Sequence, residues 1–163
     1  MQRLASFEVD HDLLSPGIYI SRVDGDVVTY DLRTRKPNSG DYMDNFTMHT
    51  VEHMMATFLR NSRIGPSVLY FGPMGCRTGF YLLVRNTASS EEVLDEVIEA
   101  LHQVVCHEGP VYGASRKECG NYFELDLERA QNECRRYADV LIGQRDMGAV
   151  SFKYPVAQRR EPE

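Results

Sequence analysis

The feature that most constrains the fold is a tight-turn signal, Asp24-Gly25, between two runs of β-forming residues. The two runs contribute Ile18, Ile20, Val27, Val28 and Tyr30. An Asp-Gly pair flanked in this way is typical of a short hairpin loop. Because so short a loop joins only antiparallel neighbours, residues 17–34 predict a hairpin and a sheet that is mostly antiparallel.

The rest of the chain mixes helical and strand-like patterns. Apolar residues recur at helical spacing in several segments, one of which begins with a Ser-Ser-Glu-Glu capping box. Helices are expected at about 46–61, 89–107 and 125–142, and further strands at 68–71 and 79–85. This mixture predicts an α/β (α+β) fold, a two-layer sandwich of a mostly antiparallel sheet with helices packed on one face.

Length and composition indicate a single folded domain. The chain has 163 residues, of which 42% are hydrophobic and 26% charged, so it resembles ordinary globular proteins and can bury a sizeable core. We expect one domain over residues 1–163, with the polar, proline-containing tail from about residue 148 loosely held.

Charge and cysteine content restrict the partners and the location. Acidic residues outnumber basic ones by 24 to 18, a net charge of −6 that disfavours nucleic acid and anionic membranes as partners. The sequence has neither a signal-peptide pattern nor an apolar run of bilayer length, so a cytoplasmic location is expected. The cysteines Cys76, Cys106, Cys119 and Cys134 are then expected to be free, metal-bound or catalytic.

The clearest chemical motif is His-x-x-Glu-His at residues 49–53, in the first expected helix. Residues four apart lie on the same helix face, so His49 and His53 can both reach one metal ion. Glu52 lies near that face and can act on a metal-bound ligand, in the residue order of the inverzincins. The plainer alternative is a solvated helix face, but the neighbouring Met54 and Phe58 are apolar. The motif therefore favours a metal site.

Two histidines do not complete a metal site, and a third ligand with one open position is expected. The candidates are His11, His102, His107, Cys76, Cys106, Cys119 and Cys134. Cys119 differs from the others because it lies in a loop, where a thiolate can be directed at a metal. Gly120 beside it allows a close approach of the backbone.

Cys76 is the other notable thiol, between Gly75 and Arg77 at the beginning of an expected strand. Gly72 and Gly75 allow a sharp bend that exposes the sulfur, and Arg77 would favour a reactive thiolate. A buried turn cysteine fits the same sequence equally well.

Five segments of the chain, in the same order, resemble the S-ribosylhomocysteine lyases (LuxS), the enzymes that make the autoinducer-2 precursor. They are Ser6–His11, Tyr30–Arg33 with Pro37-Asn38, His49–His53, Pro73–Tyr81 and Cys119–Tyr122. The resemblance covers about residues 6–141. Five matching segments in the family's order identify the family far more specifically than any one of them would alone.

The resemblance implies a metal-dependent carbon–sulfur lyase and assigns roles by position. The metal ligands would be His49, His53 and Cys119. The acid/base pair would be Cys76 and Glu52. The substrate pocket would be lined by Ser6, His11 and Arg33. The family points to Fe²⁺, and a His₂Cys set also suits Zn²⁺ or Co²⁺. A homodimer with its active sites at the subunit interface is implied as well.

The implied reaction cleaves S-ribosylhomocysteine to homocysteine and 4,5-dihydroxy-2,3-pentanedione by carbonyl migration and β-elimination. One segment departs from the family pattern. Many members carry Asp-x-Ser before Pro-Met-Gly-Cys, and this chain has Tyr70-Phe71-Gly72 there. An acidic group that is close to substrate in the family is therefore missing.

Two other functions fit parts of the sequence. An inverzincin-type metallopeptidase or hydrolase would use Glu52 to activate water, but such enzymes usually take a downstream Glu as the third ligand. A non-enzymatic zinc or redox-sensing protein would use Cys76 as its sensor and leave Ser6, His11 and Arg33 without a role. The lyase is the reading that uses all of these residues.

Overall fold

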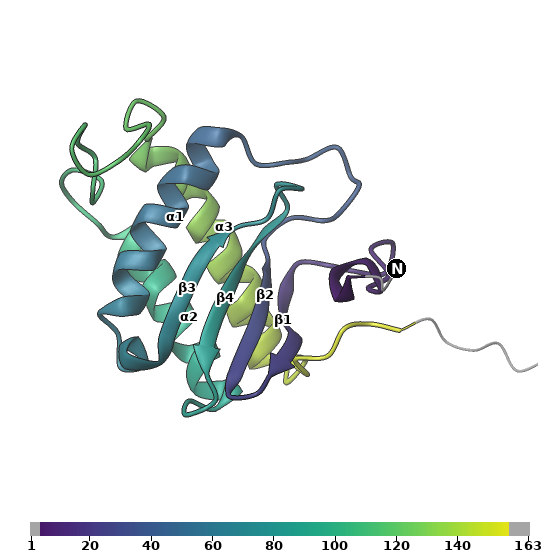
Figure 1. Cartoon of the computed structure of the whole chain (residues 1–163). Coiled ribbons are helices and arrows are strands. Elements are labelled where there is room, and N and C mark those ends of the chain that lie inside the picture. The colour runs from purple at the N-terminus through teal and green to yellow at the C-terminus, as the bar shows by residue number, and fades with distance from the viewer. Residues whose placement is uncertain (1–3, 157–163) are drawn as a thin grey trace, which may run out of the picture.

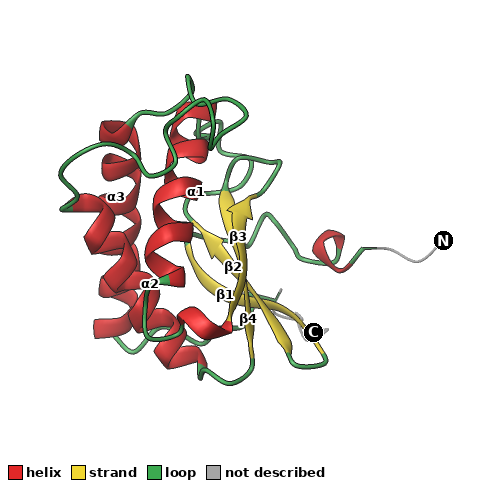
Figure 2. Cartoon of the chain, turned by 60° about the vertical axis from the view of Figure 1, so that its left-hand side comes forward, coloured by secondary structure: helices red, strands yellow, loops and turns green. Residues whose placement is uncertain are grey.

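The computed structural model describes residues 4–156. Its elements are η1 (Ala5–Phe7), β1 (Gly17–Asp24), β2 (Val27–Arg33), α1 (Asn45–Arg60), η2 (Gly65–Ser67), β3 (Val68–Pro73), β4 (Gly79–Arg85), α2 (Ser90–Val105) and α3 (Leu127–Asp146). The strands form one sheet (Figure 1), and α1, α2 and α3 all lie on the same face of it (Figure 2). This confirms the predicted fold class.

The sheet has the strand order β1-β2-β4-β3, and each neighbouring pair is antiparallel. The predicted hairpin is formed by β1 and β2, and Gly25 in its turn has φ +61°, a conformation that glycine adopts without steric cost. The register places Arg33 opposite Gly79 and Asp31 between Tyr19 and Tyr81.

Side chains alternate between the two faces of β2. Tyr30 and Leu32 belong to the buried apolar core, together with apolar residues of the three helices. Asp31 and Arg33 therefore point to the helix-free face, yet they are 0% and 2% exposed. A buried ion pair on the open face of a sheet requires other groups to cover it, and one of them is the Tyr154 hydroxyl, which donates to Asp31 Oδ2 at 2.7 Å.

Side-chain caps define where the helices begin. The Asp44 carboxylate accepts a hydrogen bond from Thr47 N at 2.7 Å and caps α1, the helix of the His-x-x-Glu-His motif. Ser89 and Glu92 form the predicted capping box of α2. Among the described residues, no helix has the length and apolar content needed to cross a bilayer.

Both edge strands have polar partners outside the sheet. The backbone N–H of Ile20 in β1 donates to the carbonyl of Phe152 at 2.8 Å. At the other edge, Arg60 donates to the carbonyls of Val68 and Leu69 in β3 at 3.4 and 2.8 Å. The segment expected to be loosely held from residue 148 thus contacts the sheet within the described part, and residues 157–163 lie outside it.

Candidate metal centre

His49, His53 and Cys119 converge at one end of the molecule. Their ligand atoms all lie within 4.8 Å of one another, and all three residues are half-buried. His49 Nε2 is 3.4 Å from Cys119 Sγ, and the two imidazole centroids are 4.7 Å apart. Within residues 4–156, no other group of His, Cys, Asp and Glu side chains converges in this way.

The loop before α3 brings Cys119 to the helix. The chain turns after Ser115, whose carbonyl accepts hydrogen bonds from the N–H groups of Glu118 and Cys119 at 3.1 and 3.0 Å. This turn orients the thiol of Cys119. Gly113 has φ +70°, and a Cβ atom there would lie 3.2 Å from His53 Nδ1. Glycine at this position therefore lets the loop pass close to the histidine.

Hydrogen bonds leave the ligand atoms available. His53 Nδ1 lies 2.8 Å from the carbonyl oxygen of Tyr112, which can only accept, so Nδ1 carries the proton and Nε2 keeps its lone pair. Asn121 N donates to Cys119 Sγ at 3.4 Å. Two imidazoles and a thiolate fit a tetrahedral divalent ion with one position left for a substrate.

Cys76 lies exposed in the β3–β4 turn, next to two polar groups of the sheet. Its Sγ is 3.1 Å from Thr78 Oγ1 and 3.8 Å from Arg33 Nη1. Arg33 is thus a cation beside the thiol, one that the sequence pattern around Cys76 did not indicate. Arg77 is at φ +62°, with its guanidinium 5.6 Å from the centroid of the Tyr42 ring.

Arg33 is held by the carboxylate of Asp31. Nε and Nη2 of Arg33 donate to Oδ1 and Oδ2 of Asp31 at 3.1 and 2.5 Å, and Nη1 donates to Thr78 Oγ1 at 2.8 Å. Burial alone would lower the pKa of Arg33, but the hydrogen bonds and charge of Asp31 outweigh it and raise the pKa above its usual value. The guanidinium therefore stays charged beside Cys76.

The predicted site residues form two groups in one chain. The end of the molecule at the top of Figure 1 carries the start of α1 with His49 and Glu52, the Cys119 loop and the β3–β4 turn with Cys76. Ser6 in η1 and His11 lie beside β1, and Figure 2 shows η1 projecting away on the helix-free side of the sheet. His11 Nδ1 is 2.9 Å from the carbonyl of Val9.

Where this chain departs from the family pattern, at Tyr70-Phe71-Gly72, the residues Tyr70 and Gly72 are coupled to each other. Tyr70 and Gly72 lie on the same side of β3, and the Tyr70 hydroxyl occupies the space in which a Cβ atom of residue 72 would lie. Tyr70 is 51% exposed. A serine at position 72 would thus require Tyr70 to move.

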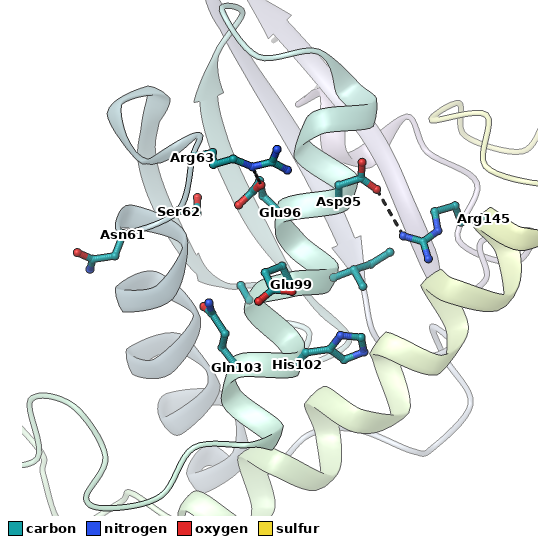
Figure 3. A pocket seen from close by; sticks show the side chains of 11 residues that line it. Asn61, Ser62, Arg63, Asp95, Glu96, Glu99, His102, Gln103 and Arg145 are labelled. Atoms are coloured by element: carbon teal, nitrogen blue, oxygen red, sulfur yellow. Dashed lines mark hydrogen bonds and ion pairs between the residues drawn. The ribbon is translucent and has the colours of Figure 1, made fainter.

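A separate cavity of about 730 Å³ is lined mainly by α2 and the residues after α1 (Figure 3). Two of its carboxylates have cationic partners: Arg63 Nε is 2.5 Å from Glu96, and Arg145 Nη1 is 3.4 Å from Asp95. Its lining includes His102, one of the candidate third ligands, but none of the residues to which the family resemblance assigns a role.

Comparison with known proteins gives one consistent family. The model of the S-ribosylhomocysteinase (LuxS) family matches residues 4–147. The S-ribosylhomocysteine lyase of Borreliella afzelii is 40% identical over 160 residues, which cover 95% of this chain and 100% of that protein. The protein of the same name from Finegoldia magna is 42% identical over 145 residues, covering 86% and 92%. That of Desulfotalea psychrophila is 40% identical over 160 residues, covering 95% and 99%.

Proposed function

The chain belongs to the S-ribosylhomocysteinase (LuxS) family, and on this premise we propose that it cleaves S-ribosylhomocysteine to homocysteine and 4,5-dihydroxy-2,3-pentanedione. The observation that carries the proposal is the convergence of His49, His53 and Cys119 at the end of the molecule that also holds Cys76. A cysteine as the third member of this group also favours a lyase over an inverzincin-type peptidase.

A divalent metal would be held by Nε2 of His53, Nε2 of His49 and Sγ of Cys119. We propose Fe²⁺, for which Zn²⁺ or Co²⁺ can substitute in a His₂Cys site. When bound, such an ion acts as a Lewis acid that stabilises negative charge on the sugar oxygens, worth several kcal/mol.

The chain's own groups would move the protons. The carbonyl must migrate from C1 to C3 of the sugar before the C4 proton is acidic enough for β-elimination of the thiol. Each step removes a proton beside a carbonyl and returns one to a neighbouring atom. We assign this work to the Cys76 thiolate, beside the fixed charge of Arg33, and to Glu52 on the ligand helix. Each such group typically contributes on the order of 10²–10⁴-fold.

A homodimer would complete the site. Ser6 and His11 lie at the β1 edge of the sheet, whereas α1 with its histidines packs against β3 at the other edge. We propose that Ser6 and His11 of one subunit serve the metal centre of the other. The helix-free sheet face, the projecting η1 and the exposed Phe7 and Tyr70 support this arrangement.

A reducing compartment suits the proposed chemistry. All four cysteines are free thiols, including the exposed Cys76, and the cytoplasm keeps thiols in that state. We therefore propose a cytoplasmic enzyme that acts on a small molecule.

The test is anaerobic purification followed by metal analysis and a thiol-release assay on S-ribosylhomocysteine. We expect about one divalent ion per chain, together with stoichiometric release of homocysteine. Metal-loaded protein that releases no thiol from this substrate would refute the proposal.

A further inference from the structure

The segment after α3 returns across the edge strand β1. The carbonyl of Phe152 accepts the N–H of Ile20, and Phe152 forms an isolated parallel bridge with Tyr19. Phe152 has φ +58°, a left-handed conformation that is costly for a residue other than glycine. Such a conformation persists where surrounding contacts fix it. The contacts of this segment are therefore specific.

Two residues after this bridge, Tyr154 lies on the helix-free face of the sheet. Its ring stacks on that of Tyr19, with centroids 5.3 Å apart and an interplanar angle of 22°. Its hydroxyl donates to Oδ2 of Asp31 at 2.7 Å. Burial and the neighbouring Asp31 raise the pKa of Tyr154, so the phenol keeps its proton and acts as the donor.

Asp31 connects this tyrosine to the candidate site. Oδ2 of Asp31 accepts from both Tyr154 and Nη2 of Arg33, and Oδ1 accepts from Nε of Arg33. These bonds fix the plane of the guanidinium and leave Nη1 directed at Thr78 and Cys76. Since Asp31 is fully buried, losing one donor would leave part of its charge unsatisfied, and the ion pair would have to shift.

We propose that Tyr154 is a positioning residue of the active site, which acts through Asp31 to hold Arg33 against Cys76. This inference rests on the proposed lyase function for its kinetic consequence. Tyr154 lies beyond residues 4–147 that the family model matches, so the family resemblance assigns it no role.

The test compares Tyr154→Phe with Tyr19→Phe. The first removes the hydroxyl that donates to Asp31 and also contacts the Ser21 side chain, and the second removes a hydroxyl that donates to the carbonyl of Ser15 at 2.7 Å. Both variants keep the stacked rings. We expect Tyr154→Phe to lower kcat by about tenfold, as for one lost hydrogen bond to a buried charge, with KM and metal content unchanged. Tyr19→Phe should match the parent.

A second measurement does not require lyase turnover. In a Cys106→Ala background, which removes the other exposed thiol, the rate of iodoacetamide alkylation reports on Cys76. We expect this rate at neutral pH to fall in Tyr154→Phe and to stay at the parental value in Tyr19→Phe. A purely structural tyrosine would lower the unfolding midpoint and leave the alkylation rate unchanged, and that result would overturn the inference.

The two measurements separate the inference from the proposed function. If the parent protein releases no homocysteine, the lyase assignment fails, and the alkylation rates still decide whether Tyr154 positions Arg33. If the parent is active and Tyr154→Phe equals it in both kcat and alkylation, the positioning role is wrong.

Discussion

The carbonyl oxygen of Tyr112 lies 2.8 Å from Nδ1 of His53, a residue 59 positions earlier in the chain. This contact fixes the imidazole in the tautomer whose Nε2 is free for a metal. The same loop carries Cys119, so one stretch of backbone both orients a ligand and supplies another.

Removing any one ligand should therefore abolish stoichiometric metal binding. We expect His49→Ala, His53→Ala and Cys119→Ala each to be purified without tightly bound metal, as measured by elemental analysis. Cys106→Ala is the matched control, because Cys106 is an exposed cysteine at the end of α2 outside the group. Full metal content in Cys119→Ala would reassign the third ligand, with His11 the next candidate.

Cys76 and Glu52 are expected to be required for chemistry but not for folding. Cys76→Ala and Glu52→Gln should dimerise and bind metal like the parent, yet lose at least about 10²-fold in homocysteine release. The double variant should be no worse than either single one, because groups in one proton-transfer sequence fail together. Loss of metal in Glu52→Gln would instead make Glu52 a ligand.

A shared site predicts complementation between two inactive chains. A Ser6→Ala/His11→Ala variant and a Cys119→Ala variant should each be inactive alone. When co-expressed with different tags and purified as a mixed dimer, they should recover about half of parental activity, because one of two symmetric sites is then intact. An inactive mixed dimer would place each site within a single chain, and light scattering would show whether the parent is a dimer at all.

The cap of the ligand helix should make stability depend on pH. Burial alone would raise the pKa of Asp44, but hydrogen bonds from Thr47 and the charge of Arg129 outweigh it and lower the pKa. A lowered folded-state pKa adds stability above the unfolded-state value, near 4, and this is lost as pH falls through the folded value.

Asp44→Ala should therefore lower the free energy of unfolding by about 1 kcal/mol at pH 7. In urea titrations of metal-free protein, the difference from the parent should shrink as the pH is lowered below about 4. Asp95→Ala, which removes an exposed carboxylate of α2 that pairs with Arg145 of α3, should cost nothing comparable. An equal loss at every pH would mean that the Asp44 charge is not involved.

Tyr70 and Gly72 should behave as a coupled pair. Gly72→Ser alone forces the Tyr70 ring off its position, whereas Tyr70→Asp makes room for the added side chain. A double-mutant cycle should give an interaction free energy of at least about 0.5 kcal/mol, with the two changes together less destabilising than the sum of each alone. Additive effects would show that the Tyr70 ring moves away freely.

Local sequence patterns predict most of the elements. The Asp24-Gly25 turn, the Ser89 capping box and the strand at 79–85 appear where expected. The last helix was expected at about 125–142 and spans Leu127–Asp146 instead, because Asp126 caps its beginning and polar residues extend its end. The first helix, expected at about 46–61 from apolar spacing, spans Asn45–Arg60, so the missed ends of the last helix are where its apolar pattern gives way to polar residues.

Long-range polar contacts could not be predicted in this way. Arg33 meets Cys76 only through the register of β2 on β4, which the hydrophobic pattern does not specify to one residue. Tyr154 lies in a polar tail without periodicity, and its partner Asp31 is 123 positions away. The metal ligands, in contrast, include two residues whose proximity follows from helix geometry alone.

The contacts made by the two edge strands, β1 and β3, affect how copies of the protein can associate. An edge strand with free backbone groups can recruit a strand from another molecule, and such growth has no natural end. Phe152 already binds β1, and Arg60 binds carbonyls of β3, which finishes in a proline that has no N–H to donate. Strand-by-strand polymerisation is thereby discouraged, whereas the closed pair proposed above would form through the face of the sheet and leave these edges as they are.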